Sequence, residues 1–359
     1  MEARQINKIF ACVSILLIGA ATACSGSSPS PAPGGTSPVS GQPATTPPGA
    51  APAWGAAKNL DHGRVIEDPT SVSCPAESFC MAVLGSGYAA RYDGTRWSQP
   101  AKLTSAAGEP DSVSCPTVSF CMAVDAQDSS AFVFNGSTWR PAPSISGLVP
   151  GTQRGMASVS CSSPDFCAAV SNGSSAVTFN GTSWSPATDI DPGQELGTVS
   201  CPSARFCAAV DYGPDVVTFN GTSWSKPSAI DPGSYLQAVS CASARFCVAL
   251  DRKGNALTFN GSTWSAPVNA DPDGLTMGEG GISWPVVSCP ASNFCAAVDG
   301  GTGNVVTFDG SNWTAPLNVD SQAARSLNGP VLIFLMSVSC PSAAFCVAGD
   351  TTGDAFVRS

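Results

Sequence analysis

Short apolar runs, separated by polar turn segments, follow one another from residue 54 to the end of the chain. In one unit of this pattern the runs are TVSC, FCAAVD, DVVTFN and SWSKP, at residues 198–201, 206–211, 215–220 and 223–227. Each run is rich in β-branched or aromatic residues and is bounded by Pro, Gly, Asn or Asp, which is typical of β-strands. The pattern therefore predicts four short strands per unit and an all-β fold.

The unit recurs seven times. Every copy contains VSC, a short loop and FC, and the first cysteines of successive copies lie 41, 46, 40, 40, 48 and 51 residues apart. Four strands repeated seven times at this spacing predict a seven-bladed β-propeller with four strands per blade.

A second motif closes six of the copies. It consists of an aromatic residue, Asn or Asp, Gly, two further residues and Trp. Asn-Gly and Asp-Gly are strong hairpin signals, and they predict a type I′ turn, with positive φ at both central residues, between the third and fourth strands. An aromatic residue at a fixed place in every repeat is expected to pack between neighbouring blades. These residues are Trp97, Trp139, Trp184, Trp224, Trp264 and Trp313.

The two ends of the repeat region complement each other. The seventh copy stops at Ser359 after its third strand, whereas residues 53–61 contain Trp54 at the usual distance before the next VSC. We therefore expect residues 54–359 to form one propeller whose last blade takes three strands from the C-terminus and one from the N-terminus. Such a clasp would close the ring and remove free sheet edges, which a linear solenoid does not need.

The cysteines of each copy are separated by five residues across the hairpin of the first two strands, so the two sulfurs can face each other. In an exported protein they are expected to be oxidised, and a metal site would need other ligands in a chain with a single histidine, His62. One disulfide per blade is predicted. The pairs are Cys74–Cys80, Cys115–Cys121, Cys161–Cys167, Cys201–Cys207, Cys241–Cys247, Cys289–Cys295 and Cys340–Cys346.

The N-terminus has the features of an export signal. Arg4 and Lys8 precede an apolar run of signal-peptide length, which ends in GAATAC at Cys24. This ending resembles a lipobox, so we expect residues 1–23 to be a signal peptide and Cys24 to carry a lipid such as palmitate; the alternative is a plain signal peptide cut near Ala23. Residues 24–53 contain no charge and few bulky apolar side chains, as expected of a disordered Ser/Pro/Gly/Ala tether.

The repeats resemble those of a known group of proteins. The pattern SCPSxxFCxAVDxxGNxxTFNGSxWSxP, carried by residues 54–359, is similar to repeats in secreted and lipid-anchored β-propeller proteins of high-GC Gram-positive bacteria. The resemblance implies a propeller at the cell surface and no particular activity. A weaker similarity links the Gly and Trp to the Asp-box of sialidase-like propellers, which places one residue between its Asp and Gly where this chain has none.

The charges indicate which partners to expect. A net charge of −10, with 16 Lys and Arg residues in all, argues against nucleic acid as a binding partner. Aspartates recur at two positions, four residues after the second cysteine and just after the fourth strand. Both positions fall on the end of the propeller that carries the turns between second and third strands and the connections between blades, here called the loop face; the opposite end is the hairpin face. The aspartates are Asp125, Asp211, Asp251, Asp299 and Asp350 at the first position and Asp61, Asp191, Asp231, Asp271 and Asp320 at the second.

These ten aspartates are candidate ligand-binding residues, as an acidic rim around the central channel that suits a cation, a polyol or a basic partner. Calcium is the one cofactor that they suggest, because it takes several oxygen ligands. The alternative is ordinary turn chemistry, since Asp caps its own loop. Trp284, in a Gly-rich insertion outside the repeat pattern, is a further candidate contact.

The anchor, the tether and repeats without a distinctive catalytic residue favour a lipoprotein on the extracytoplasmic side of the cell membrane. We expect a monomeric, non-catalytic binding or scaffold module that holds a glycan, a peptide or a protein on its acidic loop face. The alternatives are a glycan-active hydrolase or lyase of sialidase-like propeller type, with two carboxylates as acid and base, and a purely structural spacer. Against catalysis, the chain has one histidine, and Arg205 and Arg245 fall on the hairpin face.

Overall fold

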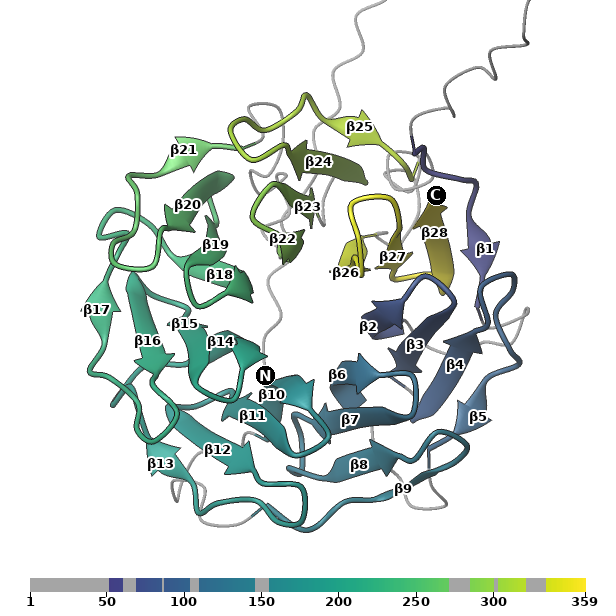
Figure 1. Ribbon diagram of the computed structural model, residues 1–359, viewed down its shortest axis with the longest axis horizontal. Helices are drawn as coiled ribbons and strands as arrows, with labels where there is room; N and C mark the ends of the chain where they lie inside the picture. Colours follow the sequence, from purple (N-terminus) through teal and green to yellow (C-terminus); the bar gives the residue numbers. More distant parts are fainter. Residues whose placement is uncertain are drawn as a thin grey trace, which may run out of the picture. The chain divides into compact units, whose positions relative to one another are not determined.

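The computed structural model describes residues 52–60, 69–85, 87–103, 110–145, 155–270, 285–299, 303–320 and 334–359. They form seven four-stranded antiparallel sheets, arranged in a ring as the blades of a propeller (Figure 1). The predicted fold class is therefore confirmed. Among the described residues no helix is long and apolar enough to cross a bilayer. Residues 1–51, which include the predicted signal peptide, Cys24 and most of the tether, lie outside the described residues.

Each blade runs from an inner strand, nearest the centre of the ring, to an outer one at its rim (Figure 1). The first strands are β2 (Pro69–Ala76), β6 (Pro110–Thr117), β10 (Met156–Ser163), β14 (Leu196–Ser203), β18 (Leu236–Ser243), β22 (Val286–Ala291) and β26 (Leu335–Ser339). The second strands are β3 (Phe79–Leu84), β7 (Phe120–Asp125), β11 (Phe166–Ser171), β15 (Phe206–Asp211), β19 (Phe246–Asp251), β23 (Phe294–Val298) and β27 (Cys346–Asp350). The third strands are β4 (Tyr88–Tyr92), β8 (Ala131–Phe134), β12 (Ser175–Phe179), β16 (Asp215–Phe219), β20 (Asn255–Phe259), β24 (Asn304–Phe308) and β28 (Asp354–Arg358). The fourth strands are β5 (Ala101–Lys102), β9 (Trp139–Pro141), β13 (Thr188–Asp189), β17 (Ser228–Ala229), β21 (Val268–Asn269), β25 (Leu317–Asn318) and, in blade 7, β1 (Lys58–Asn59).

The second strand of each blade is apolar almost throughout because both of its faces are covered. In β15, Cys207 to Asp211 are all buried, between the core shared with blade 3 and the core shared with blade 5. Every apolar cluster of the ring likewise combines residues of two adjacent blades, so no blade buries its faces alone. This explains why the FCxAVD runs do not alternate between apolar and polar residues.

The seventh blade is closed as predicted. β1 pairs antiparallel with β28, with Lys58 opposite Ala355 and Asn59 opposite Asp354. Gly55 N donates to Val357 O at 2.8 Å, and Ala53 exchanges two backbone hydrogen bonds with Ser359. Leu60 is 1% exposed and packs into the core between blades 7 and 1. The N-terminal strand therefore covers the outer edge of the blade formed by the C-terminus.

The serine of each VSC motif joins neighbouring blades. Its Oγ accepts a hydrogen bond, 2.9–3.0 Å long, from the backbone N–H of the VSC cysteine in the next blade, and the series runs through all seven blades back to its start. These serines are Ser73, Ser114, Ser160, Ser200, Ser240, Ser288 and Ser339. The ring is thus closed at its centre by side-chain hydrogen bonds as well as at its rim by β1.

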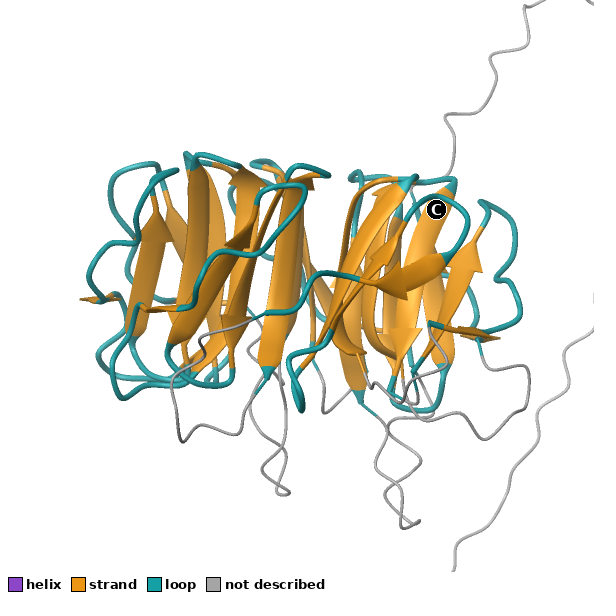
Figure 2. Ribbon diagram, turned by 90° about the horizontal axis from the view of Figure 1, so that it is seen from below, coloured by secondary structure: helices purple, strands orange, loops and turns teal. Residues whose placement is uncertain are grey.

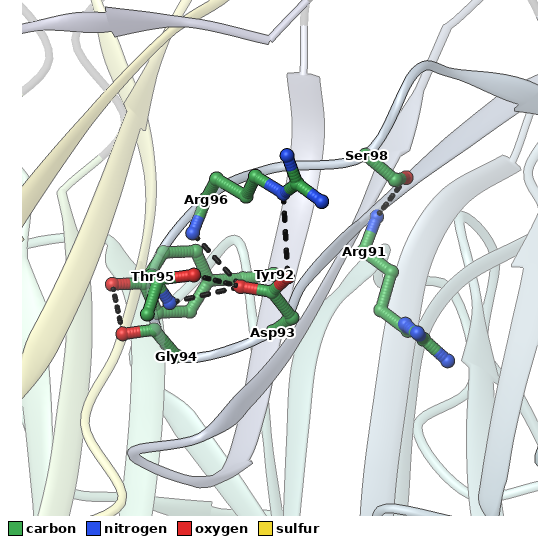
Figure 3. Close-up of polar contacts among 7 residues, drawn as sticks. All are labelled: Arg91, Tyr92, Asp93, Gly94, Thr95, Arg96 and Ser98. Atoms are coloured by element: carbon green, nitrogen blue, oxygen red, sulfur yellow. Dashed lines mark hydrogen bonds and ion pairs between the residues drawn. The ribbon is translucent and has the colours of Figure 1, made fainter.

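The Asn-Gly and Asp-Gly turns lie where they were predicted, but their type differs from type I′. Gly221 has a φ of 97°, whereas no Asn at these turns has a positive φ. Asn220 Oδ1 accepts hydrogen bonds from the backbone N–H groups of Thr222 and Ser223, which holds Asn in an ordinary conformation and leaves the left-handed one to Gly. Figure 3 shows the same arrangement in blade 1, where Asp93 accepts from Thr95 and Arg96.

Packing also requires glycine at these turns, because there is little room for a side chain. A Cβ on Gly221 would lie 3.2 Å from Arg205 Cα, in the disulfide hairpin of the same blade. All seven predicted disulfides are present, with Cα–Cα distances of 3.9–4.1 Å. Disulfide hairpins and Gly turns therefore share the hairpin face. Because the strands of a blade are antiparallel, the turns between second and third strands lie at the opposite end of the blades. Figure 2 shows the two ends of the ring from the side.

The repeated tryptophans lie against the aromatic residue at the end of the third strand of their own blade. In blade 3 the rings of Phe179 and Trp184 have centroids 5.2 Å apart, and the other five pairs lie at 5.3–5.5 Å. Trp184 also belongs to the core between blades 2 and 3. The expected packing role is therefore confirmed, with contacts inside the blade as well as between blades.

Candidate functional site

The structure describes eight of the ten candidate aspartates, and all eight are buried, at 5% exposure or less. They are Asp125, Asp191, Asp211, Asp231, Asp251, Asp299, Asp320 and Asp350. Asp61, Asp271 and Trp284 lie outside the described residues. The carboxylates are indeed at the loop-face ends of their strands, but they lie beneath the surface and do not form a solvated acidic rim.

The aspartates that end the second strands cap the turn that follows. Asp251 Oδ1 accepts hydrogen bonds from the backbone N–H groups of Lys253 and Asn255, at 2.8 and 2.7 Å. Asp350 Oδ1 accepts from Thr352 N and Oγ1 and from Asp354 N. One carboxylate oxygen therefore organises the turn between the second and third strands, as in the turn-chemistry alternative.

Two of the aspartates that follow fourth strands, Asp191 and Asp231, lie beside the capping aspartate of the next blade. Burial, and then the neighbouring Asp251, raises the pKa of Asp231. Burial, with the charges of Asp211, Asp215 and Asp189, raises the pKa of Asp191 to about 6. The structure therefore brings these aspartates together as carboxyl pairs at the junctions between blades.

One junction holds a third carboxylate. Asp191, Asp211 and Asp215 each place a carboxylate oxygen within 4.8 Å of the oxygens of the other two. Asp215 opens β16 and was not among the predicted site residues. The sequence does contain a signal that could have identified Asp215. It lies four residues after the capping Asp211, and the equivalent position holds Asn255 in blade 5 and Asp354 in blade 7.

The loop face also carries an aromatic and cationic patch made of Tyr235 and Lys253, which are exposed, and Arg252, which is half-buried. Tyr235 is 56% exposed, and the Arg252 guanidinium lies 5.3 Å from the centroid of its ring. Lys253 Nζ donates a hydrogen bond to Gly233 O. The patch joins the connection that follows blade 4 to the β19–β20 turn of blade 5, and its residues belong to none of the motifs that the repeats share.

Two cavities have linings that include none of the eight buried aspartates. A groove of about 840 Å³ between the outer strands of blades 3 and 4 is lined by residues including Asp165, Phe219, Trp224 and Lys226. A second, of about 450 Å³, is lined by Arg91, Asp93, Arg96 and their neighbours in blade 1, which Figure 3 shows in part. Both are lined by residues of the Gly turns of the hairpin face.

Comparison with known proteins supports the fold. No family model matches the chain, and no curated protein sequence matches it. Among solved structures, the WD40 repeats of RRP9 superpose with a TM-score of 0.67 at 11% identity, over 86% of this chain and 98% of theirs. YCF48 bound to a D1 peptide gives 0.62 at 13% identity, over 85% and 96%, and YCF48 from Cyanidioschyzon merolae gives 0.60 at 16%, over 85% and 98%. At these identities the likeness shows the propeller fold alone.

Proposed function

We propose that this protein is a non-catalytic binding module that holds a protein or peptide on its loop face. The observation that carries the proposal is the aromatic and cationic patch of Tyr235, Arg252 and Lys253 on a rigid ring. Tyr and Arg are enriched among the residues that supply most of the energy of protein interfaces. Two propellers of similar fold are a YCF48 with a bound peptide and WD40 repeats, which is consistent with such a role.

The burial of the aspartates alters how the loop face would recognise a ligand. The eight described carboxylates are covered and therefore present little charge to a ligand. Recognition would instead use the exposed ring of Tyr235 and the cations beside it, which suits an acidic peptide segment rather than a basic one. The covered carboxylates also disfavour the glycosidase alternative, because a sugar has to lie between two accessible carboxyl groups.

We further propose that the module is held at the extracytoplasmic side of the membrane by a lipid on Cys24. The GAATAC ending and the uncharged residues 25–53 support this. The chain from this segment enters the ring at β1, the clasp strand of blade 7. Mass spectrometry of the exported protein should find a diacylglycerol on Cys24, and an unmodified Cys24 would refute the anchor.

The binding proposal can be tested with peptide and glycan arrays and a glycoside-hydrolase panel on the intact protein. We expect binding to acidic peptides that is weakened at least tenfold by Tyr235→Ser together with Arg252→Ala, since hot-spot residues contribute about 2 kcal/mol or more. Val118→Ser, which changes an exposed apolar residue on the hairpin face, is the matched control and should bind normally. Glycoside turnover would refute the non-catalytic role, and equal peptide binding by all three proteins would refute the patch.

A further inference from the structure

The junction between blades 3 and 4 gathers three carboxylates from two turns. Asp191 follows β13, Asp211 ends β15 and Asp215 begins β16. One oxygen of each lies within 4.8 Å of the others. Asp191 and Asp211 are 3% and 0% exposed, and Asp215 is half-buried, so the cluster is enclosed on its inner side and reaches solvent through Asp215.

Two oxygens in this cluster lack a donor. The Oδ2 atoms of Asp191 and Asp211 are fully covered and accept no hydrogen bond from the described residues. The other oxygen of Asp211, Oδ1, does have a donor, the backbone N–H of Asp215 at 2.8 Å. Buried carboxylate oxygens are normally hydrogen-bonded or coordinate a cation, because leaving them without either costs free energy.

The next blade shows how the same repeat satisfies the corresponding oxygen. There Asn255 occupies the position of Asp215, and its Nδ2 donates to Asp251 Oδ2 at 2.9 Å. In blade 4 a carboxylate replaces that amide, so a donor is lost and a negative charge is added at the same point. A bound cation would compensate for both changes at once.

We propose that Asp191, Asp211 and Asp215 bind a divalent cation, and that calcium is the ion that fits. The donors are all carboxylate oxygens, the ligands that calcium and magnesium take. Calcium–oxygen distances of about 2.3–2.6 Å allow ligand atoms up to about 5 Å apart across the ion, whereas magnesium at about 2.0–2.1 Å allows about 4.2 Å. The three oxygens lie within 4.8 Å of one another, a separation that calcium can span, and its flexible coordination suits side chains that come from two turns. Water at the Asp215 side would complete the coordination.

The cation would act on the connection between the two blades. Asp191 begins the turn in which Gln194 N donates to Asp191 O, and Leu196 N then donates to Gly173 O, in the β11–β12 turn of blade 3. Calcium held by Asp191 on one side and by Asp211 and Asp215 on the other would tie this connection to the β15–β16 turn. The bound state should therefore be more heat-stable than the ion-free state.

The test uses the intact, chelator-treated protein, with CaCl2 as the probe. Calorimetry should find calcium bound in the range of about 10⁻⁴–10⁻³ M that is typical of extracellular modules, and weaker magnesium binding. Calcium at about 10 mM, above that range, should raise the melting temperature. Absence of both heat and a thermal shift at this concentration would overturn the proposal.

Asp215→Asn is the decisive variant, because it recreates the Asn255 arrangement of blade 5. It should lose calcium binding at least tenfold, yet in chelator its melting temperature should equal or exceed that of the unchanged protein, since the amide can donate to Asp211 Oδ2. This second readout separates loss of the site from loss of the fold. Asn255→Ala is the matched control and should bind calcium normally. Equal calcium binding by Asp215→Asn and the unchanged protein would overturn the assignment.

Discussion

At the scale of single residues, the VSC motif has two functions, of which only one was predicted. Its cysteine was recognised because paired cysteines at fixed spacing indicate disulfides in an exported chain. Its serine has no comparable signature, because a small polar residue near the start of a strand is common. The contact that it makes, from Ser200 to Cys241 N for example, joins residues 41 apart in different blades, and strand patterns within one blade do not reveal such a contact.

Replacing one of these serines should weaken the ring measurably. Ser200→Ala leaves the buried Cys241 N–H without its 2.9 Å acceptor, so we expect a loss of about 1 kcal/mol in the free energy of unfolding, measured by chemical denaturation. Ser200→Thr keeps the hydroxyl and should retain most of the stability. Ser228→Ala, in the exposed strand β17, is the control. Equal losses for Ala and Thr would indicate that the volume of the side chain matters and not the hydrogen bond.

At the scale of elements, strands were easier to predict than the turns that join them. The four apolar runs of each repeat marked the strands. In a repeat of about 44 residues, a short apolar run between turn residues can form few structures other than a β-strand. The Asn-Gly pairs marked the hairpins but not their type. The turn type depends on whether the Asn side chain accepts from the backbone, as Asn180 does from Thr182 and Ser183, and the dipeptide alone does not determine this.

The clasp strand is the element whose removal should matter most. Deleting residues 52–60 removes the hydrogen bonds to β28 and the buried Leu60, and it exposes a sheet edge. Loss of a buried Leu alone typically costs about 2–5 kcal/mol, so the melting temperature should fall by many degrees and aggregation should increase. Deleting residues 25–50, outside the described residues, is the control and should leave the melting temperature unchanged. Similar thermal curves for both deletions would show that β1 does not stabilise the ring.

At the scale of the whole molecule, the sequence predicted which end of the propeller carries the aspartates but not their depth. The topology determines at which face of the propeller a strand ends. This was enough to place Asp191, Asp211, Asp231 and Asp251 on the same face. Depth depends on how closely adjacent blades pack, which no single repeat encodes. As a result, carboxylates that the sequence suggested as a surface feature are internal to the ring, and the exposed patch around Tyr235 was not anticipated.

Buried carboxyl groups should make the stability of the whole ring fall as the pH rises from about 4 to about 7. Burial raises the pKa of Asp350 to about 7, although hydrogen bonds from Asp354 and Thr352 oppose the shift. In the unfolded chain an Asp has a pKa of about 3.9, so between these values the folded state holds a proton that the unfolded state has released. Linkage then requires the free energy of unfolding to decrease with pH, by up to about 1.4 kcal/mol per pH unit for one proton.

Asp350→Asn isolates this contribution. An amide cannot ionise, yet its oxygen can still accept the hydrogen bonds from Thr352 N and Asp354 N. Chemical denaturation in chelator at several pH values between 4 and 7 should therefore show a shallower decline for the variant than for the unchanged protein. Exposed Asp93, whose pKa is held below its usual range by hydrogen bonds from Thr95 and Arg96, titrates below this window and does not interfere with the comparison. Parallel pH profiles for the two proteins would mean that Asp350 is ionised in the folded ring.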